Sequence, residues 1–268
     1  MTALFTDNDF VFFKNALMEA GAMARRIQKE TIAVNRKSDR SIVTQADLMV
    51  QDLLMQRISD RYDNVTFIME ENNSGSVPDI GDDTLSAIID PIDGTAMFSM
   101  HLPEWCVSVG IFRGYTPVYG FVYSPGFDML FYNDDGNAYM NERPLRAERK
   151  IIIDNETNIF CASEVSNRFF FDFPGKIRNL GSTALHACLA ADNARNRTLA
   201  FIGKSNLWDW AGAVPIVLKA GCMVRYFGGE EIDYRAVIEN KNRLLDYVVV
   251  YNVDDFDSIR NIFKPRPV

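Results

Sequence analysis

Apolar residues recur at helical spacing in the first part of the chain. Between residues 6 and 30 they fall at positions 10, 13, 17, 20, 24 and 27. This spacing predicts a long amphipathic helix that Thr6 or Asp7 can cap. A second helix is predicted over residues 44–61, where Thr44 and Asp47 have the spacing of a capping box. The polar residues 35–41 between the two helices predict a loop.

Runs of β-branched and aromatic residues then predict strands over 65–69, 85–90, 105–112, 117–123 and 129–132, followed by a hairpin to residue 145. Turns around Gly114 and Gly126 predict that these strands are antiparallel. The second half alternates predicted strands (159–162, 198–202, 223–226, 247–250) with predicted helices (182–191, 207–219, 254–262). The pattern predicts a layered α/β (α+β) fold. We expect two halves, 1–150 with most of the chemistry-bearing residues and 151–268 completing a shared cleft, in one compact unit.

Composition narrows the possible functions. The formal net charge of −8 argues against a nucleic-acid binder, and no apolar run is long enough for a membrane helix. The four cysteines form no Cys-x-x-Cys pair, and the first residues lack a secretory signal pattern, so we expect a cytoplasmic protein with reduced thiols. Only two histidines are present, which disfavours histidine-rich metal sites and most nucleophile–histidine designs.

The most informative stretch is an apolar run that ends in two carboxylates three residues apart, Asp90 and Asp93, followed by Gly94 and Thr95. Because Pro91 cannot donate to a sheet, we expect the strand to stop there. Two close carboxylates repel unless a proton or cation lies between them, and Mg²⁺ takes oxygen ligands together with substrate phosphate. Gly94 allows a ligand to approach the backbone. The stretch therefore suggests metal-assisted chemistry on a phosphate, with an Asp-rich turn as the alternative.

Three further carboxylates occupy similar places. Glu70 follows a predicted strand, Asp209 opens a predicted helix, and Asp47 lies near a helix start. Ligand crevices form at strand ends in layered α/β folds, so we expect these groups to converge. Each has a plain alternative: a solvated turn for Glu70, and a helix cap for Asp209 and Asp47. The aspartyl-phosphatase motif Asp-x-Asp does not fit, because the carboxylates here are one residue too far apart.

In order and spacing these motifs resemble the inositol monophosphatase family, part of the Mg²⁺-dependent, lithium-sensitive sugar-phosphatase superfamily. The matching segments are 37–47, 67–71, 90–98, 181–185 and 208–221. The resemblance implies a layered αβαβα sandwich with mixed, largely antiparallel sheets and a homodimer. It also implies hydrolysis of a small phosphate monoester by metal-activated water, with two to three Mg²⁺ ions, or Mn²⁺ instead.

The resemblance also implies individual roles. It assigns the first metal to Glu70, Asp90 and the Ile92 carbonyl, the second to Asp90, Asp93 and Asp209, and a weaker third to Asp47 and Glu70. The implied catalytic residues are Asp47, Glu70 and Thr95, with Thr95 and Asp47 orienting the attacking water. The implied substrate-binding residues are Asp93, Gly94, Thr95, Ser182, Thr183 and Asp209, and Lys37 lies on a loop that could help to close the site.

Some positions depart from the family pattern. Met97 replaces a common Asn, and Ile202 stands where inositol phosphatases have a carboxylate that contacts substrate hydroxyls. Lys219 and Cys222 also differ. Inositol or polyol monophosphates, fructose bisphosphate, phosphoadenosine phosphate and histidinol phosphate therefore remain candidate substrates. A second phosphate could meet the basic residues Arg195, Arg197 and Lys204, or these could form a solvated loop. An alternative of another class is a non-catalytic, metal-binding regulatory homologue.

Overall fold

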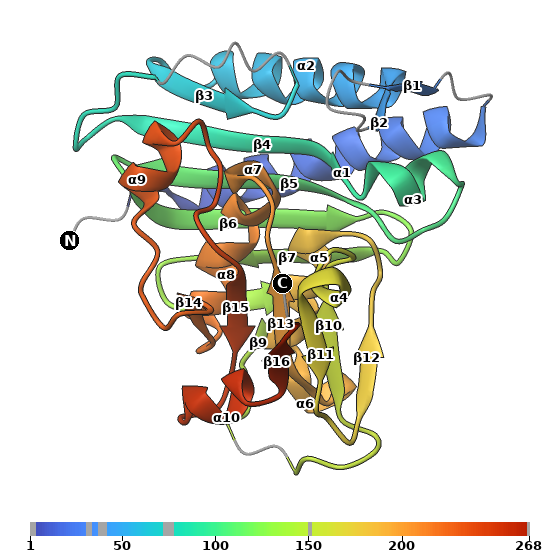
Figure 1. Ribbon diagram of the computed structural model, residues 1–268. Coiled ribbons are helices and arrows are strands. Elements are labelled where there is room, and N and C mark those ends of the chain that lie inside the picture. Colours follow the sequence, from blue (N-terminus) through green and yellow to red (C-terminus); the bar gives the residue numbers. More distant parts are fainter. Residues whose placement is uncertain (1–3, 31–33, 37–41, 72–77, 150–151, 267–268) are drawn as a thin grey trace.

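The computed structural model describes residues 4–30, 34–36, 42–71, 78–149 and 152–266, and its sheets alternate with layers of helices (Figure 1). The predicted loop residue Lys37 lies outside the described residues. The larger sheet has seven strands in the order β3-β4-β5-β6-β7-β8-β9, and the smaller has five in the order β12-β10-β13-β15-β14. Both sheets are mixed, with antiparallel pairs in the majority in the larger one. The predicted layered α/β class is confirmed.

The bounds of the elements follow the chain. The strands of the larger sheet are β3 (Val65–Met69), β4 (Leu85–Asp93), β5 (Cys106–Arg113), β6 (Thr116–Ser124), β7 (Met129–Asn133), β8 (Ala138–Met140) and β9 (Arg143–Leu145). Those of the smaller sheet are β10 (Asn158–Cys161), β12 (Lys176–Arg178), β13 (Thr198–Gly203), β14 (Met223–Tyr226) and β15 (Val248–Tyr251). Two ribbons are separate from both sheets: β1 (Val34–Arg36) with β2 (Ile42–Thr44), and β11 (Phe169–Phe171) with β16 (Phe263–Pro265).

Helices cover the sheets in three layers. The first comprises α1 (Asp7–Lys29) and α2 (Gln45–Ser59), which lie on one face of the larger sheet (Figure 1). The middle layer between the sheets comprises α5 (Thr183–Ala191), α7 (Leu207–Ala211) and α8 (Ala213–Lys219). The outer core of the smaller sheet includes residues of α4 (Val165–Arg168) and α10 (Phe256–Arg260). Shorter helices are α3 (Thr95–Ser99), α6 (Asn193–Asn196) and α9 (Tyr234–Glu239).

The first helix forms as its pattern predicts. Thr6 is the N-cap of α1, and a reciprocal capping box joins it to Asp9. The apolar face is buried against the larger sheet, where the Phe13 and Phe121 rings stack 4.8 Å apart. Stacked aromatic pairs of this kind add to the free energy gained from burial, so α1 is firmly attached to the sheet.

The predicted single helix over 207–219 is wrong, because the chain forms two helices that meet at Gly212. The carbonyls of Ala211 and Gly212 lie against the sheet at Gly110 and Gly120, where a Cβ would collide with them. Close approach of backbone to backbone requires glycine on the sheet side. The middle helices are therefore seated unusually close to β5 and β6.

The prediction that the strand stops at Pro91 is also wrong, because β4 continues to Asp93. Its pairing with β3 ends at Ile89, so Pro91 needs no partner on that side. On the other side the register with β5 shifts between Asp90 and Asp93. This irregularity lies beyond the last β3 pair, where it accommodates the missing N–H and brings both carboxylates to one place.

Several elements have no counterpart among the sequence predictions: β1, β2, β11, β12, β16, α4, α6 and α9. Each has three to six residues, which is too short for a hydrophobic period to show. All four cysteines are free and buried. Among the described residues, no helix has both the length and the apolar character needed to cross a bilayer.

Candidate metal centre

Three carboxylates from distant parts of the chain meet where β4 approaches α7. Asp90 and Asp93 come from β4 and Asp209 from α7. One carboxylate oxygen of each lies within 4.8 Å of the others. Asp90 and Asp93 are buried and Asp209 is partly exposed, so the cluster opens to solvent on one side.

Two more acidic residues border this cluster. Glu70 follows β3, and its backbone N–H donates to the Ile89 carbonyl on β4 at 3.3 Å. Asp47 is fully buried in the first turn of α2. Burial is the largest cause of the raised pKa of Asp90, and the charges of Glu70, Asp93, Asp209 and Asp47 raise it further. All five sequence-predicted carboxylates therefore lie close enough to interact.

Asp93 is held by the second half of the chain. Ser182 Oγ donates to it at 2.6 Å, and the backbone N–H groups of Ala184 and Thr183 donate at 2.6 and 3.0 Å. Ser182 is the N-cap of α5, so the N–H groups at the start of this helix point at the carboxylate. The Cys106 thiol donates to the same carboxylate at 3.7 Å. Asp93 thus fixes α5 to β4.

Asp209 is not the N-cap of its helix, which corrects one reading of the sequence. Asn206 is the N-cap, and its backbone N–H donates to Asp209 Oδ2 at 2.8 Å in a capping box. The spacing Asn206-x-x-Asp209 was visible in the sequence and is the signal that could have found it. The Asp209 carboxylate therefore takes part both in the helix cap and in the cluster.

A tight turn connects β4 to α3. Gly94 has φ +100°, and a Cβ at this position would lie 2.9 Å from the Glu104 carbonyl oxygen. Only glycine adopts this conformation without strain and without a clash. Thr95 then begins α3, and its hydroxyl donates to the Ile92 carbonyl at 3.0 Å, with Asp47 Oδ1 at 3.5 Å. The Ile92 carbonyl has a second lone pair that can accept or coordinate another group.

The electrostatics of the cluster fit a hard cation. Burial raises the pKa of Asp90, Asp93 and Asp209, although the hydrogen bonds from α5 lower that of Asp93. A divalent cation relieves this repulsion in place of protons, and Mg²⁺ prefers carboxylate and carbonyl oxygens. Burial also raises the pKa of the Cys106 thiol well above its ordinary value, so this residue stays protonated and is a poor metal ligand.

A cavity of about 140 Å³ lies beside the Ser182–Thr183 turn. Its lining includes Glu164 and Asn179, and Glu164 Oε1 accepts the Lys204 N–H at 3.0 Å. Burial lowers the pKa of His186 to about 3, so its neutral ring accepts the Leu180 N–H through Nε2 at 2.6 Å. Sequence reasoning missed Glu164, Asn179 and His186 as site residues, because no motif marks them.

The positions that depart from the family pattern are accommodated in different ways. Met97 packs under the turn at Gly181, where a Cβ would meet its side chain at 2.5 Å. Ile202 is fully buried in the outer core of the smaller sheet. Arg195 and Arg197 form ion pairs with Asp192 and Asp154, respectively.

Comparison with known proteins finds consistent matches. The family described as "Inositol monophosphatase family" matches residues 8–249. Inositol monophosphatase 1 of Solanum lycopersicum is 31% identical over 231 residues, which is 82% of this chain and 84% of the relative. The crystal structure of the extragenic suppressor protein suhB from Bartonella henselae superposes with a TM-score of 0.78 at 24% identity, covering 96% of this chain and 98% of that one. The IMPase of Thermotoga maritima also gives 0.78, at 23% identity and with 95% and 96% covered. These two structures establish the fold.

Proposed function

The chain belongs to the inositol monophosphatase family, and from this premise we propose that it hydrolyses a small phosphate monoester in a Mg²⁺-dependent reaction. Membership makes it a phosphatase, a phosphoric monoester hydrolase, of this superfamily. The observation that carries the proposal is the cluster of Asp90, Asp93 and Asp209, the first two of them buried, with carboxylate oxygens within 4.8 Å of one another. Such a cluster is costly to fold without a cation.

Two to three Mg²⁺ ions, or Mn²⁺ in their place, are the proposed cofactors. The first would be held by Glu70, Asp90 and the Ile92 carbonyl, the second by Asp90, Asp93 and Asp209, and a weaker third by Asp47 and Glu70. Bound there, the metal would neutralise the phosphate charge and lower the pKa of a water molecule. No histidine or thiol nucleophile is needed, which agrees with the neutral His186 and the protonated Cys106.

Thr95 is the proposed residue that orients the attacking water. Its hydroxyl proton is directed at the Ile92 carbonyl, with Asp47 as a second acceptor. The lone pairs of Thr95 Oγ are then free to accept a hydrogen bond from the water. The first N–H groups of α3, at Gly94 and Thr95, have no intrahelical acceptor and are the proposed donors to the phosphate.

The cavity beside Ser182 and Thr183 is the proposed site of the alcohol part of the substrate. Ile202 has no carboxylate to place at this position, and its side chain is buried in the outer core of the smaller sheet. We propose that Glu164 accepts the substrate hydroxyls instead, since the Lys204 N–H holds one of its oxygens in the cavity wall. A cavity of about 140 Å³ with such a lining suits a small polyol.

A bisphosphate substrate, such as fructose bisphosphate or phosphoadenosine phosphate, is the second candidate and has less support. The cations proposed to meet a second phosphate are engaged, with Arg195 and Arg197 in ion pairs and the Lys204 ammonium on the Leu245 carbonyl. An inositol or other polyol monophosphate therefore fits best. Lithium sensitivity, a homodimer, a cytoplasmic location and the role of Lys37 stay predictions from the sequence.

Phosphate release from a panel of esters tests the proposed activity. The panel contains inositol 1-phosphate, fructose bisphosphate, phosphoadenosine phosphate and histidinol phosphate, each with Mg²⁺ or with EDTA. We expect release with Mg²⁺ that falls at least about 10²-fold in EDTA, because the metal supplies most of the charge stabilisation. No release from any ester by a protein that Mg²⁺ stabilises would instead support the non-catalytic homologue.

The proposed role of Glu164 has its own test. Glu164→Gln should raise KM for the polyol ester several-fold and leave kcat nearly unchanged, because it removes a contact made equally in the ground and transition states. Glu239→Gln, an exposed change on α9, is the matched control. An unchanged KM in Glu164→Gln would remove Glu164 from the substrate site without affecting the metal centre.

A further inference from the structure

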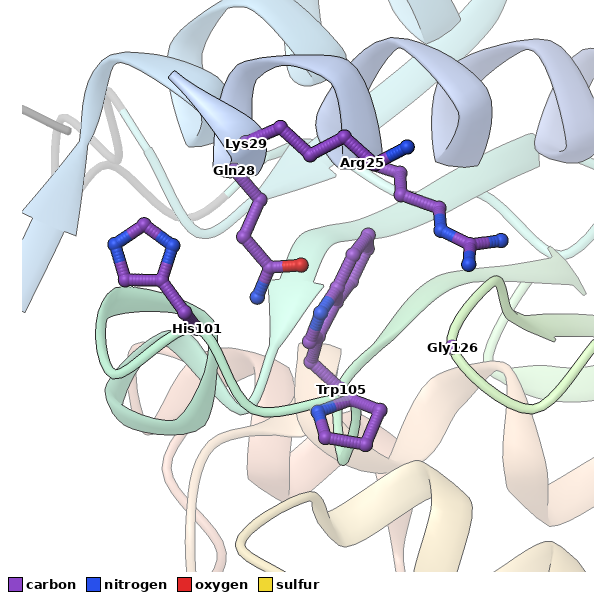
Figure 2. Close-up of a pocket in the computed structure, with 7 residues that line it drawn as sticks. Arg25, Gln28, Lys29, His101, Trp105 and Gly126 are labelled. Carbon is purple, nitrogen blue, oxygen red and sulfur yellow. The ribbon is translucent and has the colours of Figure 1, made fainter. Parts of the chain in front are cut away.

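A separate cavity of about 260 Å³ lies between the end of α1 and the segment that follows α3 (Figure 2). Figure 2 shows the Trp105 indole beneath the side chains of Gln28 and Arg25, with Gly126 on one side and His101 on the other. None of the carboxylates of the metal centre lines it. We propose that this cavity binds the phosphate group of a small molecule as a second anion site.

The lining of the cavity is basic. Arg25 and Lys29 are one helical turn apart on α1, and both are exposed. Within the described part of the chain, no carboxylate lies within ion-pair distance of either residue, and none lines the cavity. Two like charges at this spacing repel each other. An anion between them would relieve that repulsion.

The helix end provides an alternative reason for these charges. Cations in the last turn of a helix are stabilised by its dipole, and Arg26 and Lys29 both lie in that turn of α1. Arg26 is also exposed but does not line the cavity. The two explanations therefore differ in what they predict for Arg26, which makes it a matched control.

The second observation is a buried donor without an acceptor. Trp105 is 0% exposed, and its indole N–H has no hydrogen-bond partner among the residues that the structure describes. A buried tryptophan N–H is normally paired, because an unpaired one costs about 1–3 kcal/mol. The neighbouring Gln28 amide nitrogen donates to the Phe98 and Leu102 carbonyls at 3.1 and 3.0 Å, and the Gln28 oxygen forms no hydrogen bond with the indole N–H.

Three polar groups of this lining are donors: a guanidinium, an ammonium and an indole N–H, with the Gln28 amide oxygen as an acceptor beside them. The ligand that satisfies such a set is rich in acceptor oxygens and negatively charged, as a phosphate is. Pro103 and the Trp105 ring supply apolar surface beside it, which suits a phosphate attached to an organic group. The site is independent of the proposed catalysis, because it uses none of the metal-centre residues.

Binding can be measured on the tryptophan itself. In EDTA, the acidic cluster repels phosphate, so inorganic phosphate should report on the second site alone. The protein has three tryptophans, and Trp105→Phe identifies the indole ¹⁵N–¹H signal that belongs to Trp105. We expect that signal to shift saturably as phosphate is added, while the signal of Trp208, beside the metal centre, stays fixed.

Alanine variants distinguish anion binding from the helix dipole as the reason for these basic residues. Arg25→Ala and Lys29→Ala should each weaken phosphate binding about tenfold or more, which corresponds to about 1.4 kcal/mol. Arg26→Ala should leave the affinity within about twofold. A nucleoside monophosphate that binds more tightly than inorganic phosphate would identify a phosphate ester as the ligand, and equal binding would identify the free ion. The proposal is overturned by no saturable shift up to about 50 mM phosphate, or by an equal loss in Arg26→Ala.

Discussion

Replacing Asp90 by asparagine should separate the stability of the metal centre from its activity. Asp90 is buried, and its neighbours in the cluster lie within 4.8 Å. At an effective dielectric constant of about 20, two unit charges at that distance repel by about 3–4 kcal/mol. Burial and the charges of these neighbours raise the pKa of Asp90, so a bound proton relieves part of this repulsion. Asp90→Asn removes one charge and keeps the shape.

We expect Asp90→Asn to stabilise the metal-free protein at pH 8 by about 1–3 kcal/mol, because only part of the repulsion is present after protonation. In a chain of this size that corresponds to a rise in Tm of about 2–5 °C. Mg²⁺, in contrast, should stabilise the wild type more than it stabilises Asp90→Asn. It stabilises the wild type by about 2.7 kcal/mol at 100 times its Kd, whereas the variant lacks a ligand shared by both proposed ions and should gain little.

Thermal unfolding in EDTA and in Mg²⁺, together with phosphate release, measures all three quantities. Asp52→Asn, an exposed change on α2, is the control and should leave stability and activity unchanged. The reasoning is refuted if Asp90→Asn keeps wild-type turnover, or if it lowers Tm in EDTA while Mg²⁺ still stabilises it. Either result would mean that Asp90 is a structural acceptor for the Ile92 N–H, which it meets at 3.1 Å.

Three further predictions concern the pH dependence of stability, the Thr95 hydroxyl and the packing at Gly120. The folded-state pKa values of Asp90 and Asp209 are raised, so the folded metal-free protein binds more protons than the unfolded chain. Its unfolding free energy should therefore fall as pH rises above 3.8. Unfolding measured in EDTA at pH 5 and at pH 8 tests this prediction. Thr95→Val should lower kcat about 10²-fold or more and leave KM and Tm little changed, whereas Thr95→Ser should keep most of the wild-type kcat. Steady-state kinetics that show an active valine variant would contradict this prediction. Gly120→Ala should lower the free energy of unfolding in urea by about 3 kcal/mol or more, because its Cβ would collide with the backbone of the middle helices. Gly136→Ala is the control, since a Cβ has room there. Equal effects of the two variants would refute the close packing.

Part of this molecule could be predicted from the sequence because the signal is local. The period of α1 shows in its apolar residues, and the two carboxylates of β4 stand beside Gly94. The strand continuing past Pro91 could not be predicted, because it depends on where the pairing with β3 ends. The break at Gly212 has a similar cause, since it depends on Gly110 and Gly120 in the larger sheet. Both errors concern contacts between elements.

In the candidate site, too, the residue types could be predicted from the sequence and their arrangement could not. The types of Asp90, Asp93 and Asp209 suggested a metal, but their separation of less than 4.8 Å comes from the packing of α7 on β4. Glu164 is the clearer case. Nothing near it in the sequence marks it, and only its bond to the Lys204 N–H, 40 residues away, places it in the cavity wall. Long-range contacts of this kind have no local signature.

The Asp93 carboxylate joins the larger sheet to the middle layer of helices, which links the stability of the fold to the proposed chemistry. Asp93 comes from the larger sheet, yet three of its hydrogen bonds come from the start of α5 in the middle layer. That layer packs closely on the larger sheet only because Gly110 and Gly120 lack side chains. A shift of the helices would therefore move the donors of Asp93 and the position of Asp209 together. It follows that Gly120→Ala, although it touches no proposed ligand, should weaken Mg²⁺ binding as well as the fold.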